Sequence, residues 1–322
     1  MTDNNYKFID ACFSKNTGRP PVWMMRQAGR YLPEYRKIRE QHSFLEMLYK
    51  PALAAEITMQ PIERFGMDAA ILFSDILVTA KALGSDLDYI EKRGPVIHNP
   101  VRTHNDLNRL DDSNTEEKLA YVFEAITQLL PELGKTNTPL IGFAGAPFTV
   151  ASYMIEGGHI EQLKTVKTMI GNDPALLLGV LDKLTNVTID YLTCQIKAGV
   201  QAIQIFDTWA GLLSWDDVQV YSLDYIKKVV DGISNIAQER SIPIILFAKG
   251  SSSFMPLLAD CGGSAISLDW QSNLVSARKN LGNTIGLQGN LDPYLLLASP
   301  SELESRVCRI LDAMKDDPGY IF

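Results

Sequence analysis

The sequence has few residues of the kinds that build metal centres or disulfide frameworks. It holds four cysteines and four histidines among 322 residues, and no two cysteines form a C-x-x-C pair. Cysteines this far apart are typical of buried thiols in a reducing compartment rather than of disulfides or a zinc site. The histidines have no ligand spacing, so we expect them at the surface. The cysteines are Cys12, Cys194, Cys261 and Cys308, and the histidines are His42, His98, His104 and His159.

Other signals are also missing, and each absence excludes a class of protein. Neither G-x-G-x-x-G nor G-x-x-x-x-G-K-[ST] occurs, so the common dinucleotide and P-loop fingerprints are excluded. No uncharged apolar run approaches a membrane span, and residues 1–7 contain no apolar signal segment. Lys and Arg number 30 against 38 Asp and Glu, which leaves no global basic footprint for nucleic acid. We therefore expect a cytoplasmic protein that binds neither nucleic acid nor a membrane.

Buried apolar segments alternate with amphipathic helices along most of the chain. There is no internal repeat, low-complexity tract or linker, so the alternation predicts one α/β domain with a parallel sheet over residues 1–322. The expected strands are residues 69–73, 140–143, 202–206, 244–247, 265–268 and 284–287, and residues 320–322 begin a further one.

Three of the expected helices have recognisable ends. Asp173 is a suitable N-cap, and the helix that follows it is expected to run to Gly199. Residues 299–302, Ser-Pro-Ser-Glu, predict a capping box with proline in the first turn of a second helix. A third helix presents apolar residues on one face from Leu119 onward and is expected to end at Gly134.

Polar or glycine-rich residues follow nearly every expected strand. A TIM barrel requires this pattern, because its site is built from the loops at the carboxyl ends of all its strands. A doubly wound sheet would instead concentrate such residues at one switch point. The sequence therefore predicts a (β/α)8 TIM barrel in which one strand is hard to place and the last is incomplete.

Positive charge is concentrated in residues 15–39. Seven basic side chains stand there against one acidic one, which gives 7 − 1 = +6 within a protein of net charge −8. Residues 20–35, rich in Pro, Gly and aromatics, predict an ordered loop. The planar guanidinium groups of Arg26 and Arg30 suit two carboxylates or phosphates. A solvated positive face is the other interpretation, and the apolar residues 23–25 between the charges favour a binding site.

Residues 21–35 closely resemble the amino-terminal signature of the uroporphyrinogen decarboxylases. The resemblance continues in the family's order through nearly the whole chain, and the complete series is far more specific than any one motif. The other matching segments are residues 73–77, 142–149, 152–158, 206–211, 247–250, 268–270 and 288–293.

The resemblance implies a distorted TIM barrel, usually a homodimer, that uses neither a metal nor an organic cofactor. Such enzymes convert the four acetate side chains of uroporphyrinogen III into methyl groups, giving coproporphyrinogen III and CO2 in porphyrin and heme biosynthesis. The composition fits this substrate independently, because a basic segment in an acidic protein concentrates the attraction for a polyanion at one place.

The resemblance makes Asp75 the catalytic residue and a substrate contact. When CO2 leaves, a pyrrole ring protonated on carbon can accept the electron pair, and a fixed carboxylate beside the ring nitrogens stabilises the cation. Asp75 follows an expected strand, at the mouth of the barrel. Without the resemblance, the N-cap of the next helix would be the favoured interpretation.

The resemblance also assigns substrate binding to eight further residues. For Tyr153 and Phe206 the alternative is core packing, and for Thr208 it is a cap. The loop contributes Arg26, Gln27, Ala28, Gly29 and Arg30, Tyr153 and Thr208 contact carboxylates, and Phe206 lines the cavity.

The sequence leaves the proton donor open. Arginine has a pKa above about 12, so Arg26 or Arg30 could donate only when strongly perturbed or through water. Asp75 could donate only if its own pKa were raised.

Three other functions fit parts of the sequence. Cobalamin- or coenzyme-linked methyltransferases of the same superfamily bind zinc through a His-x-Cys motif, and none occurs here. Lys249 follows a strand as a Schiff-base lysine would, but the resemblance makes it structural or peripheral. A non-catalytic tetrapyrrole carrier would keep the arginines and lose Asp75.

The family continues beyond the position of Phe322 into Asn-Leu-Gly-His-Gly-Ile and a final helix. The family's histidine therefore has no counterpart to assign here. A short last strand without that helix would expose apolar surface on the first and last strands of the barrel. We expect the native polypeptide to extend past Phe322 with a loop that orders over bound substrate.

Overall fold

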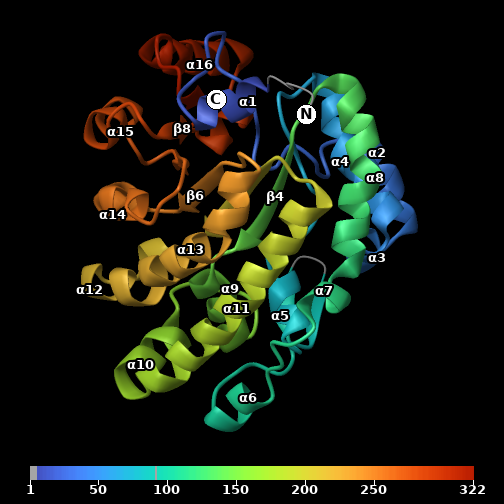
Figure 1. Cartoon of the computed structure of the whole chain (residues 1–322), viewed down its shortest axis with the longest axis vertical. Coiled ribbons are helices and arrows are strands. Elements are labelled where there is room, and N and C mark those ends of the chain that lie inside the picture. Colours follow the sequence, from blue (N-terminus) through green and yellow to red (C-terminus); the bar gives the residue numbers. More distant parts are fainter. Residues whose placement is uncertain (1–5, 91–92) are drawn as a thin grey trace.

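A curled parallel sheet lies at the centre of the molecule (Figure 1). The computed structural model describes residues 6–90 and 93–322, so most of the amino-terminal stretch expected to lack a signal segment lies outside the described residues. Seven strands pair in parallel in the order β1, β4, β5, β6, β7, β8, β9. They are β1 (Ala70–Ile71), β4 (Leu140–Gly145), β5 (Ala202–Asp207), β6 (Ile244–Ala248), β7 (Ala265–Ser267), β8 (Gly286–Gln288) and β9 (Tyr320–Ile321).

An extended segment near the amino terminus joins the two edges of this sheet. The backbone amide of Phe322 donates to Pro21 at 2.9 Å, and the amide of Trp23 donates to Phe322 at 2.8 Å, the pattern of a parallel pair. On the other side, the carbonyl of Val22 accepts from the amide of Asp68 at 3.0 Å, just before β1. The segment therefore takes the place of the strand that the sequence pattern did not locate.

This arrangement corrects the expectation of a free apolar edge at the last strand. Tyr320 and Ile321 of β9 are fully buried, and Phe322 is 9% exposed. Helix α1 (Lys7–Cys12) packs against β8 and β9, and Figure 1 shows it beside β8 and the carboxyl terminus. The amino-terminal region of the chain thus supplies both the pairing and the cover for β9.

Two predicted helix starts are confirmed. Asp173 caps α11 (Pro174–Ala198), and Gly199 in the left-handed region ends it. Ser299 caps α16 (Pro300–Met314) by accepting from the amide of the third residue, although the carboxylate of that residue pairs with an arginine one turn on instead of completing the capping box.

The predicted end of the third helix is wrong. This helix, α8 (Ala120–Thr136), continues through Gly134 and ends at Asn137, whose φ is 50°. Asparagine tolerates the left-handed conformation of a helix end nearly as well as glycine, so the earlier glycine was not required for that purpose. The loop prediction for residues 20–35 holds as far as Leu32, and Pro33 then begins α2 (Pro33–Gln41) as a first-turn proline.

The remaining helices lie on the outside of the sheet or in the loops between its strands (Figure 1). None of the helices in the described ranges is long and apolar enough to cross a membrane. The other α-helices are α3 (Phe44–Tyr49), α4 (Pro51–Phe65), α5 (Val78–Ala82), α6 (His104–Asn108), α7 (Thr115–Lys118), α9 (Pro147–Glu156), α10 (Lys164–Asn172), α12 (Trp215–Val218), α13 (Asp224–Glu239), α14 (Met255–Ala259) and α15 (Leu274–Leu281). Short turns of other helix types are η1 (Ala210–Leu212), η2 (Gln219–Leu223), η3 (Ser251–Ser253) and η4 (Pro293–Leu297).

A small antiparallel hairpin, which the sequence pattern did not indicate, lies outside the main sheet. It consists of β2 (Leu87–Ile90) and β3 (Gly94–Ile97), with Leu87 opposite Ile97 and Asp88 opposite Val96. The hairpin follows α5 and therefore belongs to the long connection between β1 and β4.

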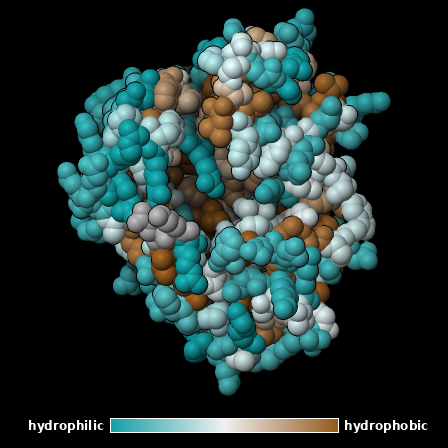
Figure 2. Space-filling model, turned by 180° about the vertical axis from the view of Figure 1, so that it is seen from behind, coloured by the Kyte–Doolittle hydropathy of each residue, from teal (hydrophilic) through white to brown (hydrophobic). Residues whose placement is uncertain are grey.

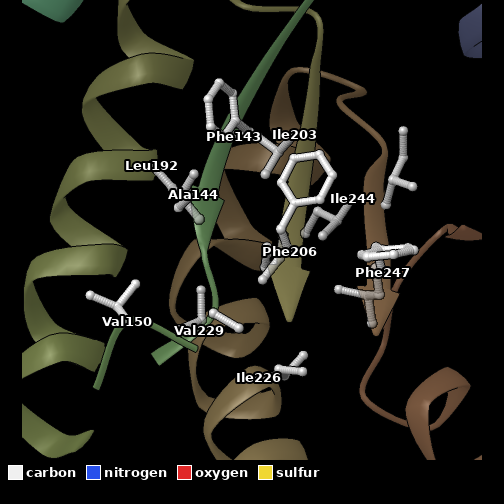
Figure 3. Close-up of a cluster of buried hydrophobic side chains, with 14 of the residues drawn as sticks. Phe143, Ala144, Val150, Leu192, Ile203, Phe206, Ile226, Val229, Ile244 and Phe247 are labelled. Carbon is white, nitrogen blue, oxygen red and sulfur yellow. The ribbon is translucent and has the colours of Figure 1, made fainter. Parts of the chain in front are cut away.

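Aromatic side chains occupy the inside of the curled sheet. Phe143, Phe206 and Phe247 come from the adjacent strands β4, β5 and β6 (Figure 3), with neighbouring ring centroids 5.7 Å and 6.0 Å apart. Two residues before Phe206 on β5, the Gln204 Nε2 donates to the Gln288 Oε1 of β8 at 3.1 Å. Polar and aromatic groups therefore share the interior near the carboxyl ends of the strands.

Three of the four cysteines are buried, as expected, but the expectation fails for Cys308. Cys308 lies on α16, whose only buried residue is Met314, so most of that helix faces solvent. The histidines follow their prediction more closely: His98, His104 and His159 are exposed, and His42 is partly exposed.

Candidate active site

Asp75 lies in the loop that connects β1 to α5. Its Oδ1 accepts a hydrogen bond from the Leu77 amide at 2.8 Å, and α5 begins only at Val78 without a side-chain cap. Burial raises the pKa of Asp75, while Tyr89, the Leu77 amide and the positive charge of Arg26 act in the opposite direction. The Asp75 carboxylate thus stabilises the turn at residues 75–77 and is not the N-cap of α5.

The segment 24–32 brings Arg26 to Asp75. Gln27 anchors this segment, because the buried Gln27 side chain donates from Nε2 to the Ala69 carbonyl at 3.1 Å, next to the start of β1. Arg26 is exposed, and its positive charge opposes the burial that raises the pKa values of Asp75 and Tyr153. Gln27 therefore anchors the loop, and Arg26 carries its charge to the site.

The structure does not bring Arg30 to the same place. Burial raises the pKa of Tyr35, and the positive charge of Arg30 acts in the opposite direction. The Arg30 carbonyl accepts a hydrogen bond from the Arg36 side chain at 3.0 Å. Between the two arginines, Ala28 packs against the small cluster that contains Tyr35, and Gly29 is partly buried. The two guanidinium groups thus face different surroundings.

Part of the basic segment is engaged elsewhere. Arg19 forms a two-pronged ion pair with Asp68, with N–O distances of 2.7 Å and 2.9 Å. Arg36 donates to the carbonyls of residues 30 and 31, and Arg39 donates to the carbonyl of His42, just beyond the segment. The interpretation of the segment as a charged, partly paired surface therefore holds for these residues.

Tyr153 lies on α9, the helix that directly follows β4. Burial, with the negative charge of Asp75, raises the pKa of Tyr153. The Trp209 side chain and the positive charge of Arg26 act in the opposite direction. The Trp209 ring packs edge-on against Tyr153 with centroids 6.0 Å apart. Trp209 follows β5, so loops from three different strands meet around Asp75.

The two predicted residues of β5 and its loop occupy different environments. Phe206 is 7% exposed and packs between the rings of Phe143 and Phe247, as a wall of the interior. Thr208 is partly exposed at the strand end. The amides of the turn that follows are capped by the neighbouring Asp207, which accepts from Trp209 and Ala210. The Thr208 side chain is therefore not the cap.

The negative charge of Asp75 also affects the pKa of four tyrosines that the sequence pattern did not indicate as site residues. Burial is the main reason that the pKa of each is raised, and the negative charge of Asp75 adds to it. No periodic pattern connects them, because they come from separate elements. They are Tyr49 at the end of α3, Tyr89 on β2, Tyr121 on α8 and Tyr191 on α11.

The face of the molecule in Figure 2 is hollowed near its middle. The floor of the hollow is coloured as hydrophobic, and hydrophilic residues surround it. Among residues 6–90 and 93–322, no group of three or more His, Cys, Asp or Glu side chains is placed to hold a metal ion.

Taken together, the fold and the site define a barrel protein of the α/β class, with a half-desolvated carboxylate, an arginine and a tyrosine at the carboxyl ends of its strands. Residues 3–322 match the family model described as uroporphyrinogen decarboxylase (URO-D). The chain belongs to the uroporphyrinogen decarboxylase family.

Relatives with that name resemble the chain over almost its full length. The uroporphyrinogen decarboxylase of Trichlorobacter lovleyi is 46% identical over 318 residues, covering 99% of this chain and 92% of the relative. That of Geobacter metallireducens is 45% identical with the same coverage. Among solved structures, a methyltransferase from Methanosarcina mazei matches with a TM-score of 0.75 at 20% identity, over 99% of this chain and 91% of that one. That likeness concerns the fold alone.

Proposed function

We propose that this chain is a carboxy-lyase that decarboxylates uroporphyrinogen III to coproporphyrinogen III. The observation that carries the proposal is the family relationship over nearly the whole chain, together with Asp75 at the end of β1 beside Arg26 and Tyr153. At each acetate the net change is R–CH2–COO⁻ + H⁺ → R–CH3 + CO2. The four steps consume four protons and need no oxidant or reductant.

Asp75 is proposed to act as an ionised carboxylate beside the pyrrole nitrogens. Protonation of a ring carbon makes the ring cationic, and the electron pair of the breaking C–C bond then flows into the ring as CO2 leaves. A carboxylate held by the Leu77 amide is already oriented and needs no rearrangement when the cation forms. Its partly desolvated position strengthens the attraction.

Substrate carboxylates are proposed to bind to Arg26, to Tyr153 and to the strand end at Thr208, with Phe206 against the macrocycle. The guanidinium group suits a carboxylate in a planar, two-pronged pair, and the tyrosine hydroxyl adds a neutral donor. In this proposal Arg30 binds a more distant carboxylate, because its side chain lies near Tyr35 rather than Asp75. Gln27, Ala28 and Gly29 shape the loop that carries both arginines.

The direct test is anaerobic incubation with uroporphyrinogen, followed by chromatography of the oxidised products by carboxylate count. We expect porphyrins with eight carboxylates to be replaced by those with seven, six, five and finally four. Binding of the tetrapyrrole without loss of carboxylates would instead indicate a carrier. Separate incubations with the type I and type III isomers measure the preference.

The pH dependence of turnover tests the protonation state of Asp75. Because burial raises its pKa, protonation of Asp75 begins at a higher pH than for an ordinary aspartate. If Asp75 acts ionised, the rate falls as the pH is lowered through its pKa. A rate that instead falls as the pH rises through the same pKa would make Asp75 the proton donor.

We also propose a cytoplasmic homodimer in which residues 1–322 act as one catalytic domain. The proposal follows the family resemblance, and the exposed apolar side chains of η4 support it: Tyr294, Leu296 and Leu297 are 75%, 61% and 83% exposed. Sedimentation equilibrium of the purified protein measures the mass in solution. A monomer at all concentrations would contradict the dimer.

A further inference from the structure

Tyr89 presents a buried hydroxyl to Asp75 from an element outside the barrel. It lies on β2 of the small hairpin, close enough to Asp75 for each group to affect the pKa of the other. The hydroxyl is buried, and within the described part of the chain no partner forms a well-aligned hydrogen bond with it. A buried hydroxyl without a partner is costly, so the orientation toward Asp75 requires an explanation.

The Tyr89 ring packs against an aromatic cluster through Phe44. Phe44, the first residue of α3, packs against it at 4.6 Å between centroids and also packs edge-on against Phe73 at 6.1 Å. Phe73 lies two residues before Asp75 and contacts Tyr35 at 6.1 Å. The same aromatic cluster therefore supports the hydroxyl and the loop that carries the carboxylate.

We propose that Tyr89 is a positioning residue for the decarboxylation, donating a hydrogen bond to the Asp75 carboxylate and orienting it toward the substrate. The inference rests on the proposed function, since it adds a residue to the same site. A hydrogen bond donated to the charged form stabilises that form. Tyr89 thus offsets part of the effect of burial and keeps Asp75 ionised at a lower pH than burial alone would allow.

Other ionisable groups also face Asp75, and their effects have to be separated from that of Tyr89. Arg26 lowers the pKa of Asp75 in the same direction as Tyr89. The remaining groups are tyrosines with raised pKa values, which stay neutral in the relevant pH range and do not compete in charge. They are Tyr49 from α3, Tyr121 from α8, Tyr153 from α9 and Tyr191 from α11.

The test removes the hydroxyl in Tyr89→Phe and compares the variant with Tyr225→Phe. Tyr225 on α13 is a matched control, because Asp182 on α11 acts on its pKa as Asp75 acts on that of Tyr89. Both helices lie outside the barrel, away from the proposed site. Turnover, KM for uroporphyrinogen and the pH dependence of kcat are measured for both. The titration of Asp75 itself is followed by infrared difference spectroscopy of the carboxyl band, with Asp75→Asn as the blank.

For Tyr89→Phe we expect kcat to fall about tenfold, as is common on loss of a hydrogen bond to a charged group, with KM unchanged within about twofold. The titration midpoint of Asp75 and the acid limb of the pH profile both move to higher pH. Tyr225→Phe leaves all these values at the wild-type level. A purely structural role for Tyr89 would lower the amount of folded protein without moving the Asp75 midpoint.

Two failures can be distinguished. If the wild-type protein does not convert uroporphyrinogen, the proposed function is wrong, while the infrared titration still shows whether Tyr89 bonds Asp75. If the wild-type protein is active and Tyr89→Phe has the same midpoint and the same kcat, the positioning role is wrong. If Tyr89→Phe does not fold, 3-fluorotyrosine at position 89 replaces it. Its more acidic hydroxyl is a stronger donor and should move the Asp75 midpoint to lower pH.

Discussion

Two aspartates stand at the ends of two strands of the same sheet, one fully buried and one partly exposed, and their surroundings differ. Asp207, at the end of β5, is fully buried and accepts hydrogen bonds from the Thr149 hydroxyl at 2.6 Å, the Ser222 hydroxyl at 2.7 Å and two amides of its own loop. Asp75, after β1, has one well-formed hydrogen bond, from the Leu77 amide. Burial raises the pKa of both.

The number of protein donors separates a structural carboxylate from a reactive one. The oxygens of Asp207 are engaged in joining β5 to α9 and η2, which leaves little capacity for a ligand. Besides burial and the Leu77 amide, Tyr89 and the positive charge of Arg26 act on the pKa of Asp75. A partly satisfied carboxylate at the mouth of a barrel can accept further donors from a substrate, which a fully satisfied one cannot.

The largest expected effect is on turnover in Asp75→Asn. The change keeps the shape and removes the charge that stabilises the cationic ring, so kcat should fall on the order of 10²–10³-fold, and at least tenfold. Binding of uroporphyrin, measured by fluorescence titration, should be nearly unchanged. A folded Asp75→Asn with wild-type turnover would show that the two aspartates do not differ in the way proposed.

The next effect is on stability, and it concerns the other aspartate. Asp207→Ala removes the acceptor of four hydrogen bonds, three of them buried, and should lower the free energy of unfolding by about 3 kcal/mol. Asp75→Ala should lower it by much less, because only the Leu77 amide loses a well-formed partner. Urea unfolding of the two variants measures the difference. Equal losses would mean that Asp75 is as deeply embedded in the fold as Asp207.

A third effect separates the two arginines. Arg26→Lys keeps the charge beside Asp75 and loses the planar fork, so we expect roughly tenfold weaker binding of uroporphyrin. Arg30→Lys should weaken it by less, because that side chain lies near Tyr35. Binding by the wild type should also weaken as salt is added, since exposed charges are screened over roughly 8 Å at physiological ionic strength. Equal effects in both variants would place the two arginines in a single clamp.

The sequence pattern predicted the parts of the fold that depend on local residue order. The fully buried strands β4, β5 and β6 appear as continuous apolar runs, and the cap at Asp173 follows from one side chain and the proline after it. The closing segment around Val22 could not be found in this way. Its pairing is with residues near the other end of the chain, and its own composition resembles a proline-rich loop.

The same limit applies to the residues near Asp75, of which the sequence pattern selects only some. Asp75, Arg26 and Tyr153 lie in motifs, and the structure places them near one another. Tyr89 lies in a short hairpin whose alternation is weak, and its closeness to Asp75 depends on how that hairpin packs beside α3. Contacts between separate elements of this kind are set by packing and leave no periodic signal along the chain.

The smallest expected effect is a pH-dependent difference in stability between the wild type and Asp75→Asn. Because burial holds the pKa of Asp75 above its value in the unfolded chain, the folded state binds this proton more tightly. As the pH rises through the folded pKa, the carboxyl must ionise in a partly desolvated place, and the wild type loses stability relative to the variant. Asp75→Asn should therefore be at least as stable as the wild type at neutral pH, and the difference should shrink as the pH is lowered toward the unfolded pKa. In Asp207→Asn, by contrast, loss of an acceptor oxygen should leave the variant less stable at every pH. Urea denaturation at several pH values measures both curves, and a difference for Asp75→Asn that grows on acidification would show that the folded state binds this proton less tightly.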